Sequence, residues 1–242
     1  MPNVAPQPGW RLALYRGAGE AGGSFQGSDR PGRGGGGWEL VPERSADEAA
    51  RRARGKVRRY CAANGLNRHG TLTYRGEGCH DPRQARTDVG RFFRRLRRGL
   101  GGDPLPYVWV PELHPGGHGF HLHFAVGRYV PRGLIEEAWG LGFIKIRLHG
   151  ELPVGSGVRE EARRSARYLS KYLDKTFRDG CGLNRYDVAK GFQPKVEAIL
   201  GRLEAEVVAE ACERMGSRPA YVWRSETQEG WRGPSAVWLQ WR

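Results

Sequence analysis

The central part of the chain alternates between two spacings of apolar residues, one typical of strands and one typical of helices. Apolar residues at every second position, or a high content of β-forming residues, predict strands at residues 70–74, 107–114, 120–126 and 143–148. Apolar residues three and four positions apart predict helices at residues 45–62, 81–100, 134–139 and 158–177. The second and third strands flank a Pro/Gly-rich turn, so we expect them to form an antiparallel hairpin. This order of elements predicts an α+β fold, in which helices flank a central antiparallel β-sheet.

The N-terminal part of the chain lacks such a pattern. Residues 16–37 contain ten glycines among 22 residues. Such a composition offers little apolar surface to offset the entropy of ordering the chain. We therefore expect residues 1–44 to form a flexible, Gly-rich segment and residues 45–180 to form the core domain.

The C-terminal part shows helical spacing again. Apolar residues between Val196 and Val207 predict a helix that begins at Pro194. Aromatic residues then predict short strands at residues 221–223 and 236–241. We expect residues 181–242 to pack on the core domain or to extend it.

The charge of the chain indicates a polyanionic partner. Its 242 residues include 40 Lys and Arg against 26 Asp and Glu, a formal charge of +14. Nucleic acid is the first expectation, since most of the basic residues are arginines, which suit bidentate phosphate contacts. No apolar run is long enough to span a membrane, and the N-terminus lacks the pattern of a signal peptide. The four cysteines form no Cys-x-x-Cys pair, so we expect free thiols and a cytoplasmic location.

Two histidines mark a candidate metal site. His121 and His123 occupy alternate positions of a strand, so both imidazoles face the same side and can bind one ion. Glu112 lies across the hairpin and can supply a carboxylate as the third ligand. His114 and His118 compete with it for that role. Two imidazoles and one carboxylate leave coordination positions open for substrate oxygens.

Two tyrosines mark a candidate nucleophile. Tyr168 and Tyr172 are four residues apart on a predicted helix, as are Lys171 and Lys175. Residues at this spacing lie on one helix face, so both phenols are expected side by side, flanked by the ammonium groups. The apolar stripe of the helix is already supplied by Ala162, Ala166, Leu169 and Leu173. The tyrosines are therefore not needed for the core and are candidates for catalysis, where a cation or metal helps a phenol to attack phosphate.

Together these motifs resemble the HUH endonuclease superfamily, and within it the rolling-circle replication initiators of plasmids and phages. The resemblance rests on Glu112, on His121-Leu-His123, on the Tyr-Leu-Ser-Lys-Tyr-Leu-Asp-Lys helix and on Thr71-Leu-Thr-Tyr74. These motifs occur in the order of the family and extend over residues 70–175. The resemblance implies a ferredoxin-like or RRM-like catalytic core. It also implies that His121, His123 and Glu112 bind Mg²⁺ or Mn²⁺.

The resemblance further implies a transesterification. A tyrosine attacks a phosphate of single-stranded origin DNA, forms a 5′-phosphotyrosine link and frees a 3′-hydroxyl for a polymerase. Two tyrosines indicate two successive transfers, for which we expect Tyr168 to nick first and Tyr172 to act later, with Lys171 and Lys175 assisting. The chain carries no Walker-type phosphate-binding motif, so a host helicase is the expected partner. The chain is expected to act as a monomer or a dimer. We expect no membrane among its partners.

Candidate DNA-binding residues lie on two elements. Lys145 and Arg147 alternate with the apolar residues of the last predicted core strand, so we expect them on the histidine face. Arg94, Arg95 and Arg98 decorate the helix at 81–100, where they either contact phosphates or form a solvated face. Two alternatives remain: a two-tyrosine transposase of the same superfamily, and a non-catalytic DNA-binding regulator that retains the fold.

Overall fold

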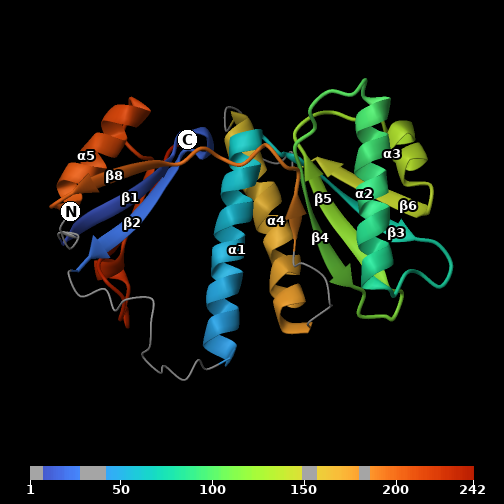
Figure 1. The fold of residues 1–242 in the computed structure, drawn as a ribbon, viewed down its shortest axis with the longest axis horizontal. Helices are drawn as coiled ribbons and strands as arrows, with labels where there is room; N and C mark the ends of the chain where they lie inside the picture. Colours follow the sequence, from blue (N-terminus) through green and yellow to red (C-terminus); the bar gives the residue numbers. More distant parts are fainter. Residues whose placement is uncertain (1–7, 28–41, 149–156, 180–185) are drawn as a thin grey trace, which may run out of the picture. The chain divides into compact units, whose positions relative to one another are not determined.

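A computed structural model describes residues 8–27, 42–148, 157–179 and 186–242. The side chains of residues 42–46, 147–148 and 174–179 also lie outside the description. The chain divides into two compact units, one of residues 41–193 and one of residues 1–40 and 194–242. Each unit contains a five-stranded antiparallel sheet among its described residues (Figure 1). The predicted α+β class is confirmed, although the strands form two sheets rather than one.

The sheet of unit 41–193 has the strand order β6-β3-β5-β4-β7. Its strands are β3 (Arg68–Tyr74), β4 (Tyr107–Leu113), β5 (Phe120–Val126), β6 (Gly142–Leu148) and β7 (Asp187–Val188). β4 and β5 form the predicted hairpin, in which Glu112 pairs with His121 and Val110 pairs with His123. On the other side of β5, Thr71 of β3 pairs with His123. The register therefore gathers polar residues of three strands on one face of the sheet.

Helices cover both faces of this sheet. α2 (Pro82–Gly99) and α3 (Arg132–Trp139) pack on one face, whereas α1 (Pro42–Asn64) and α4 (Gly157–Asp179) pack on the other (Figure 1). α2 begins where the sequence predicts, because the Asp81 side chain accepts a hydrogen bond from the Arg83 amide and Pro82 occupies the first turn.

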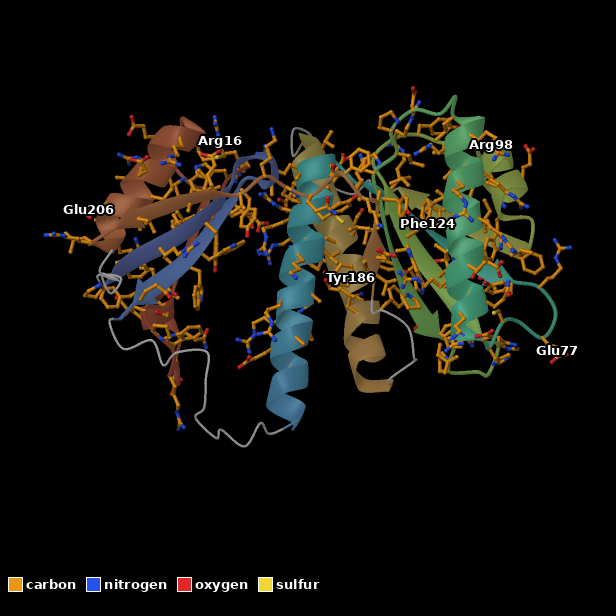
Figure 2. The ribbon with its side chains drawn as sticks, in the orientation of Figure 1. Arg16, Glu77, Arg98, Phe124, Tyr186 and Glu206 are labelled. Atoms are coloured by element: carbon orange, nitrogen blue, oxygen red, sulfur yellow. The ribbon has the colours of Figure 1, made fainter. Side chains whose placement is uncertain are left out.

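Successive side chains of β5 point to opposite faces of the sheet and so contribute to two different hydrophobic clusters. Leu122 and Phe124 lie in the cluster that α2 covers, and Figure 2 shows Phe124 beside that helix. Ala125 belongs to the cluster on the opposite face, together with Leu169 and Leu173 of α4. The α4 stripe predicted from the sequence is fully buried, since Ala162, Ala166, Leu169 and Leu173 are at most 1% exposed. The histidines of β5 consequently face α4.

The second unit corrects the prediction of a flexible segment over residues 1–44 for residues 9–26, whereas residues 1–7 and 28–41 of that segment lie outside the described residues. Its sheet has the order β8-β1-β2-β10-β9, and β1 (Gly9–Tyr15) and β2 (Glu20–Gln26) are joined by the short 3-10 turn Arg16–Ala18. Leu12, Leu14 and Ala21 of these strands are buried. Glycine is required within β2, because a Cβ atom on Gly23 would meet the Arg11 carbonyl oxygen of β1 at 2.0 Å.

The helix predicted from Pro194 is also wrong in its first part. Residues Glu197–Gly201 form β8, which pairs with β1, and helix α5 begins only at Glu204 and ends at Met215. Ile199 is buried, whereas Leu200 is 74% exposed. The apolar spacing across this segment is therefore produced by a strand followed by a helix.

The aromatic strands at the C-terminus are confirmed as β9 (Tyr221–Arg224) and β10 (Ala236–Gln240), with the 3-10 turn Ser225–Thr227 after β9. They complete the sheet of this second unit, whose core includes Trp10, Val237, Leu239 and Trp241. None of the described helices has the length and apolar character needed to cross a bilayer.

Candidate active site

His123 lies at the centre of the candidate site. Its Nε2 atom is 2.8 Å from Oε2 of Glu112, and its Nδ1 atom is 3.0 Å from Oγ1 of Thr71. The imidazole and the carboxylate are both buried, at 4% and 8% exposure. A buried polar group needs such partners, because leaving it unpaired is costly. Adjacent strands thus hold this imidazole from both sides.

The two contacts are compatible with one tautomer of the neutral His123 imidazole. An ionised carboxylate only accepts hydrogen bonds, so in that tautomer Nε2 donates to Glu112 and the Thr71 hydroxyl donates to Nδ1. A cation on Nε2 would require the other tautomer, in which Nδ1 donates to Thr71 instead. A threonine hydroxyl can serve in either direction. Moving the ring proton from Nε2 to Nδ1 would therefore open Nε2 to a metal ion while the Thr71 hydrogen bond is kept.

The two tyrosines of α4 meet each other and His123. The Tyr172 hydroxyl donates to the Tyr168 hydroxyl at 2.7 Å. The Tyr172 ring stacks on the His123 imidazole, with ring centroids 3.5 Å apart and an interplanar angle of 13°. The Tyr168 ring lies 4.4 Å from the His69 ring of β3. The four-residue spacing on α4 therefore places both phenols over the polar face of the sheet.

A lysine accompanies this pair. Lys171 lies between the two tyrosines in sequence, and its Nζ is 5.8 Å from the centre of the Tyr168 ring. An ammonium group at this distance stabilises negative charge that develops on the phenol. The side chain of Lys175 lies outside the described residues.

His121 faces the same side of the sheet but has different neighbours. Its ring is 4.6 Å from that of His114, which is 5.3 Å from the ring of His118. Burial lowers the pKa of His121, and the neighbouring His114 lowers it further by a smaller amount. Its imidazole is therefore biased towards the neutral form that can bind a metal.

The residues suit a divalent cation in chemistry, although they are not grouped around one point. Among the described residues, no three His, Cys, Asp or Glu side chains are gathered as a ready metal site. The Nε2–Oε2 spacing of 2.8 Å between His123 and Glu112 is nevertheless close to the separation of adjacent ligands around an octahedral ion, about 3 Å for ligand distances near 2.1 Å. His121 is the third candidate ligand, opposite Glu112 in the register of the hairpin.

The predicted DNA-binding residues lie on opposite sides of the sheet. In register, Lys145 of β6 pairs with Thr71, and Arg147 pairs with His69, so both belong to rows that face the candidate site. The Arg147 side chain lies outside the description. Arg94, Arg95 and Arg98 lie on α2, which covers the other face (Figure 2). The structure therefore separates the α2 arginines from the two tyrosines.

Sequence reasoning missed two residues of the site. Thr71 was noted only as part of a strand beside it, and His69 was not considered. Both alternate with the core residues Gly70 and Leu72 along β3, so their positions on the polar face follow from strand periodicity. What periodicity does not reveal is the contact each makes, since this depends on the neighbouring strand and on α4.

One comparison with known proteins finds a match. The family described as replication-associated protein ORF2/G2P matches residues 67–177. This span begins just before β3 and ends within α4, so it contains the histidines, Glu112 and both tyrosines. The match supports a role in DNA replication and therefore an interaction with DNA. No curated protein and no solved structure matches the chain.

Proposed function

We propose that the protein initiates rolling-circle replication by nicking and rejoining single-stranded origin DNA through a 5′-phosphotyrosine intermediate. The observation that carries the proposal is the contact of the paired Tyr168 and Tyr172 hydroxyls with a Glu112-bound His123, through the stacked Tyr172 ring. A candidate nucleophile thus lies against a candidate metal ligand, on a chain with a formal charge of +14. The matched family supports the replication context.

The reaction is a phosphoryl transfer in which one phosphodiester bond is formed for each one that is broken. The Tyr168 oxygen forms a bond to phosphorus, the bond from phosphorus to the 3′-oxygen breaks, and that oxygen takes up a proton to become a 3′-hydroxyl. The phenol proton passes to solvent. The Tyr172 hydroxyl donates to the attacking oxygen and stabilises its charge, as does the Lys171 ammonium. When bound, Mg²⁺ or Mn²⁺ supplies Lewis-acid polarisation of the scissile phosphate.

The residues expected to hold that ion are Glu112, His121 and His123. Thr71 fixes the orientation of His123, and β4 carries Glu112 opposite His121. Carboxylate oxygen and two neutral imidazoles suit Mn²⁺ better than Mg²⁺, although Mg²⁺ is the more available ion.

The second tyrosine allows a second transfer by the same polypeptide. After one round of replication the Tyr172 hydroxyl attacks the regenerated origin, and the freed 3′-hydroxyl attacks the first phosphotyrosine link. Because each step exchanges one phosphodiester bond for another, the strand is rejoined without ATP. The expected partners are a polymerase that extends the 3′-hydroxyl and a host helicase that exposes the strand.

The test is the formation of an SDS-stable adduct between the protein and an origin-derived single-stranded oligonucleotide in Mn²⁺. The adduct is expected with the wild type and with Tyr129→Phe, a control at an exposed tyrosine, and it should disappear in EDTA. The Tyr168→Phe, Tyr172→Phe double variant should form none. An adduct in the double variant would refute the assignment of the nucleophiles. Absence of an adduct with every cognate DNA would refute the enzymatic proposal and favour a non-catalytic regulator.

A two-tyrosine transposase would use the same chemistry on transposon ends. The match to a replication-associated family favours the initiator. Adduct formation with a plasmid or phage origin, but not with transposon ends, separates the two.

A further inference from the structure

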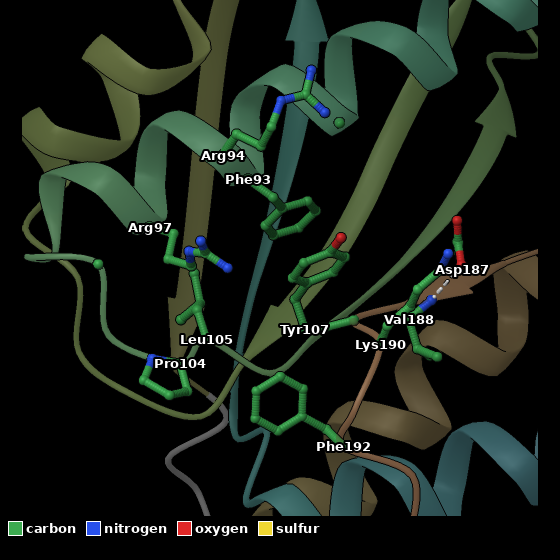
Figure 3. A pocket seen from close by; sticks show the side chains of 13 residues that line it. Phe93, Arg94, Arg97, Pro104, Leu105, Tyr107, Asp187, Val188, Lys190 and Phe192 are labelled. Carbon is green, nitrogen blue, oxygen red and sulfur yellow. Dashed lines mark hydrogen bonds between the residues drawn. The ribbon is translucent and has the colours of Figure 1, made fainter.

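A hollow of about 680 Å³ lies within unit 41–193, at the β4–β7 edge of the sheet, between α2 and the segment that follows β7. Gly90, Phe93, Arg94 and Arg97 of α2 form one wall, and Tyr107 of β4 lies at its base. The segment after α2 and the segment from β7 to Phe192 close the other sides (Figure 3). Its volume falls within the range of about 300–1,000 Å³ that is usual for small-ligand pockets.

Aromatic rings supply flat apolar surface in this hollow. The Phe93 and Tyr107 rings stack at a centroid distance of 3.5 Å and an interplanar angle of 4°. The Phe192 ring faces the same hollow from the segment after β7 (Figure 3). Two hydrogen bonds hold this segment in place: the Asn64 side-chain amide donates to the Phe192 carbonyl at 2.9 Å, and the Ala189 backbone amide donates to the Tyr107 carbonyl at 3.0 Å. The stack and Phe192 thus form a held platform on which a planar ring can lie.

Cations surround this platform. Arg94, Arg97 and Lys190 line the hollow, and each is exposed. One carboxylate, that of Asp187, also lines the hollow. It forms an ion pair with Arg86 at 3.1 Å and accepts a hydrogen bond from the Val188 amide at 2.9 Å. Among the described residues, no carboxylate lies within ion-pair distance of Arg94, Arg97 or Lys190. Three cations are thus available for an anion, and guanidinium groups bind phosphate in a bidentate manner.

The hollow continues along α2. A second one, of about 370 Å³, shares Gly90, Arg94, Tyr107 and Asp187 with the first and extends towards Arg86 and Trp109. Aromatic surface interleaved with cations along a continuous groove is the arrangement with which proteins bind single-stranded nucleic acid without reading its sequence. A free nucleotide would need only one such compartment.

We infer that this groove binds nucleotides of a single DNA strand, with a base against Tyr107 or Phe192 and the adjoining phosphates on Arg94, Arg97 and Lys190. The groove is a second DNA contact, at an edge of the sheet, and none of Glu112, His121, His123, Tyr168 and Tyr172 lines it. It rests on the proposed function only in that the ligand is DNA. It assigns a role to Arg94 but not to its neighbours Arg95 and Arg98, which do not line it.

Matched double variants test the inference. Arg94→Ala, Arg97→Ala and Arg95→Ala, Arg98→Ala remove the same charge at the same spacing from exposed positions of one helix. Binding of a fluorescein-labelled oligo-dT to the full chain is measured by anisotropy in EDTA, so a failure of nicking does not affect the result. The first variant should bind about tenfold more weakly, with a salt slope smaller by roughly 1.4, since each lost contact to a single strand removes about 0.7. The second should change affinity by no more than about twofold. Equal losses in both would overturn the inference.

Photocrosslinking locates the strand directly. Oligo-dT carrying 5-iododeoxyuridine should crosslink to Tyr107 or Phe192, as mapped by peptide mass spectrometry, and Phe192→Leu should weaken binding about fivefold or more through lost stacking. Crosslinks confined to other regions would overturn the inference. Competition by thymidine 5′-monophosphate against the labelled oligo-dT distinguishes a DNA strand from a free nucleotide as the ligand. Competition only at millimolar concentration supports the strand. Competition at micromolar concentration would overturn the strand in favour of the free nucleotide.

Discussion

The Tyr172→Phe variant tests whether the two phenols act as a pair. It removes the hydroxyl that donates to Tyr168 at 2.7 Å, but it keeps the ring that stacks on His123 at 3.5 Å. A hydrogen bond to a charged group contributes about 1.5–3 kcal/mol. Since 1.36 kcal/mol corresponds to a factor of ten in rate, the first nick by Tyr168 should slow by about 10- to 150-fold. The amount of adduct at the end of a single turnover should be unchanged.

The assay is single-turnover adduct formation with protein in excess over labelled oligonucleotide, followed on denaturing gels. Tyr60→Phe is the control, because it removes a different buried hydroxyl, that of Tyr60 on α1, which donates to the Ala189 carbonyl at 3.2 Å. This control should nick at the wild-type rate. A Tyr172→Phe rate within about twofold of wild type would refute the hydrogen-bond argument. A complete loss of adduct in Tyr172→Phe, with activity retained in Tyr168→Phe, would reverse the expected order of the tyrosines.

Three further results are expected. Thr71→Val removes the partner of His123 Nδ1 and should raise the Mn²⁺ concentration for half-maximal adduct formation by about 10- to 100-fold, with Thr71→Ser close to wild type; equal behaviour of the two variants would contradict this. Leu169→Ala creates a cavity at a fully buried position and should lower the free energy of unfolding by about 2–5 kcal/mol in urea titrations, so a loss below about 1 kcal/mol would argue against its packing. Burial raises the pKa of the Cys61 thiol, so iodoacetamide should modify the part-exposed Cys79 in the native protein but Cys61 only after denaturation, as peptide mass spectrometry would show.

Periodicity predicted β3 to β6 and α1 to α4 of unit 41–193, because these elements carry a regular apolar pattern, whereas the two-residue β7 was not predicted. The hairpin of β4 and β5 is confirmed in full, including the division of β5 between Leu122 and Phe124 on one side and His123 on the other. Alternation determines which side chains share a face, and a tight turn determines which residues pair across the hairpin. Both properties are local, so a sequence can reveal them.

The sheet of the other unit was missed as a whole because two of its four strand pairings are not local. β1 pairs with β8, and β2 pairs with β10, so more than 180 residues separate each pair in sequence. Glycine content suggested a flexible segment, yet Gly23 is where the backbone of β1 comes too close for a side chain. Composition averaged over a window does not distinguish a glycine that frees the chain from one that admits a neighbouring strand.

The candidate site shows the same division between local and non-local information. Strand alternation places His121 and His123 on one face but treats them as equivalent. The structure makes them unequal: α4 covers His123 with Tyr172, while His121 lies against His114 near the end of the hairpin. One candidate ligand is therefore held in place, by Thr71 and Glu112, whereas the described ring contact of the other is with His114. An ion that binds first to the held pair would draw His121 in, so the His121→Ala variant should retain a weakened Mn²⁺ site, whereas His123→Ala should lose both the site and the surface on which Tyr172 rests. Calorimetric titration of Mn²⁺ into both variants checks this order, and equal losses would show that the two histidines are equivalent after all.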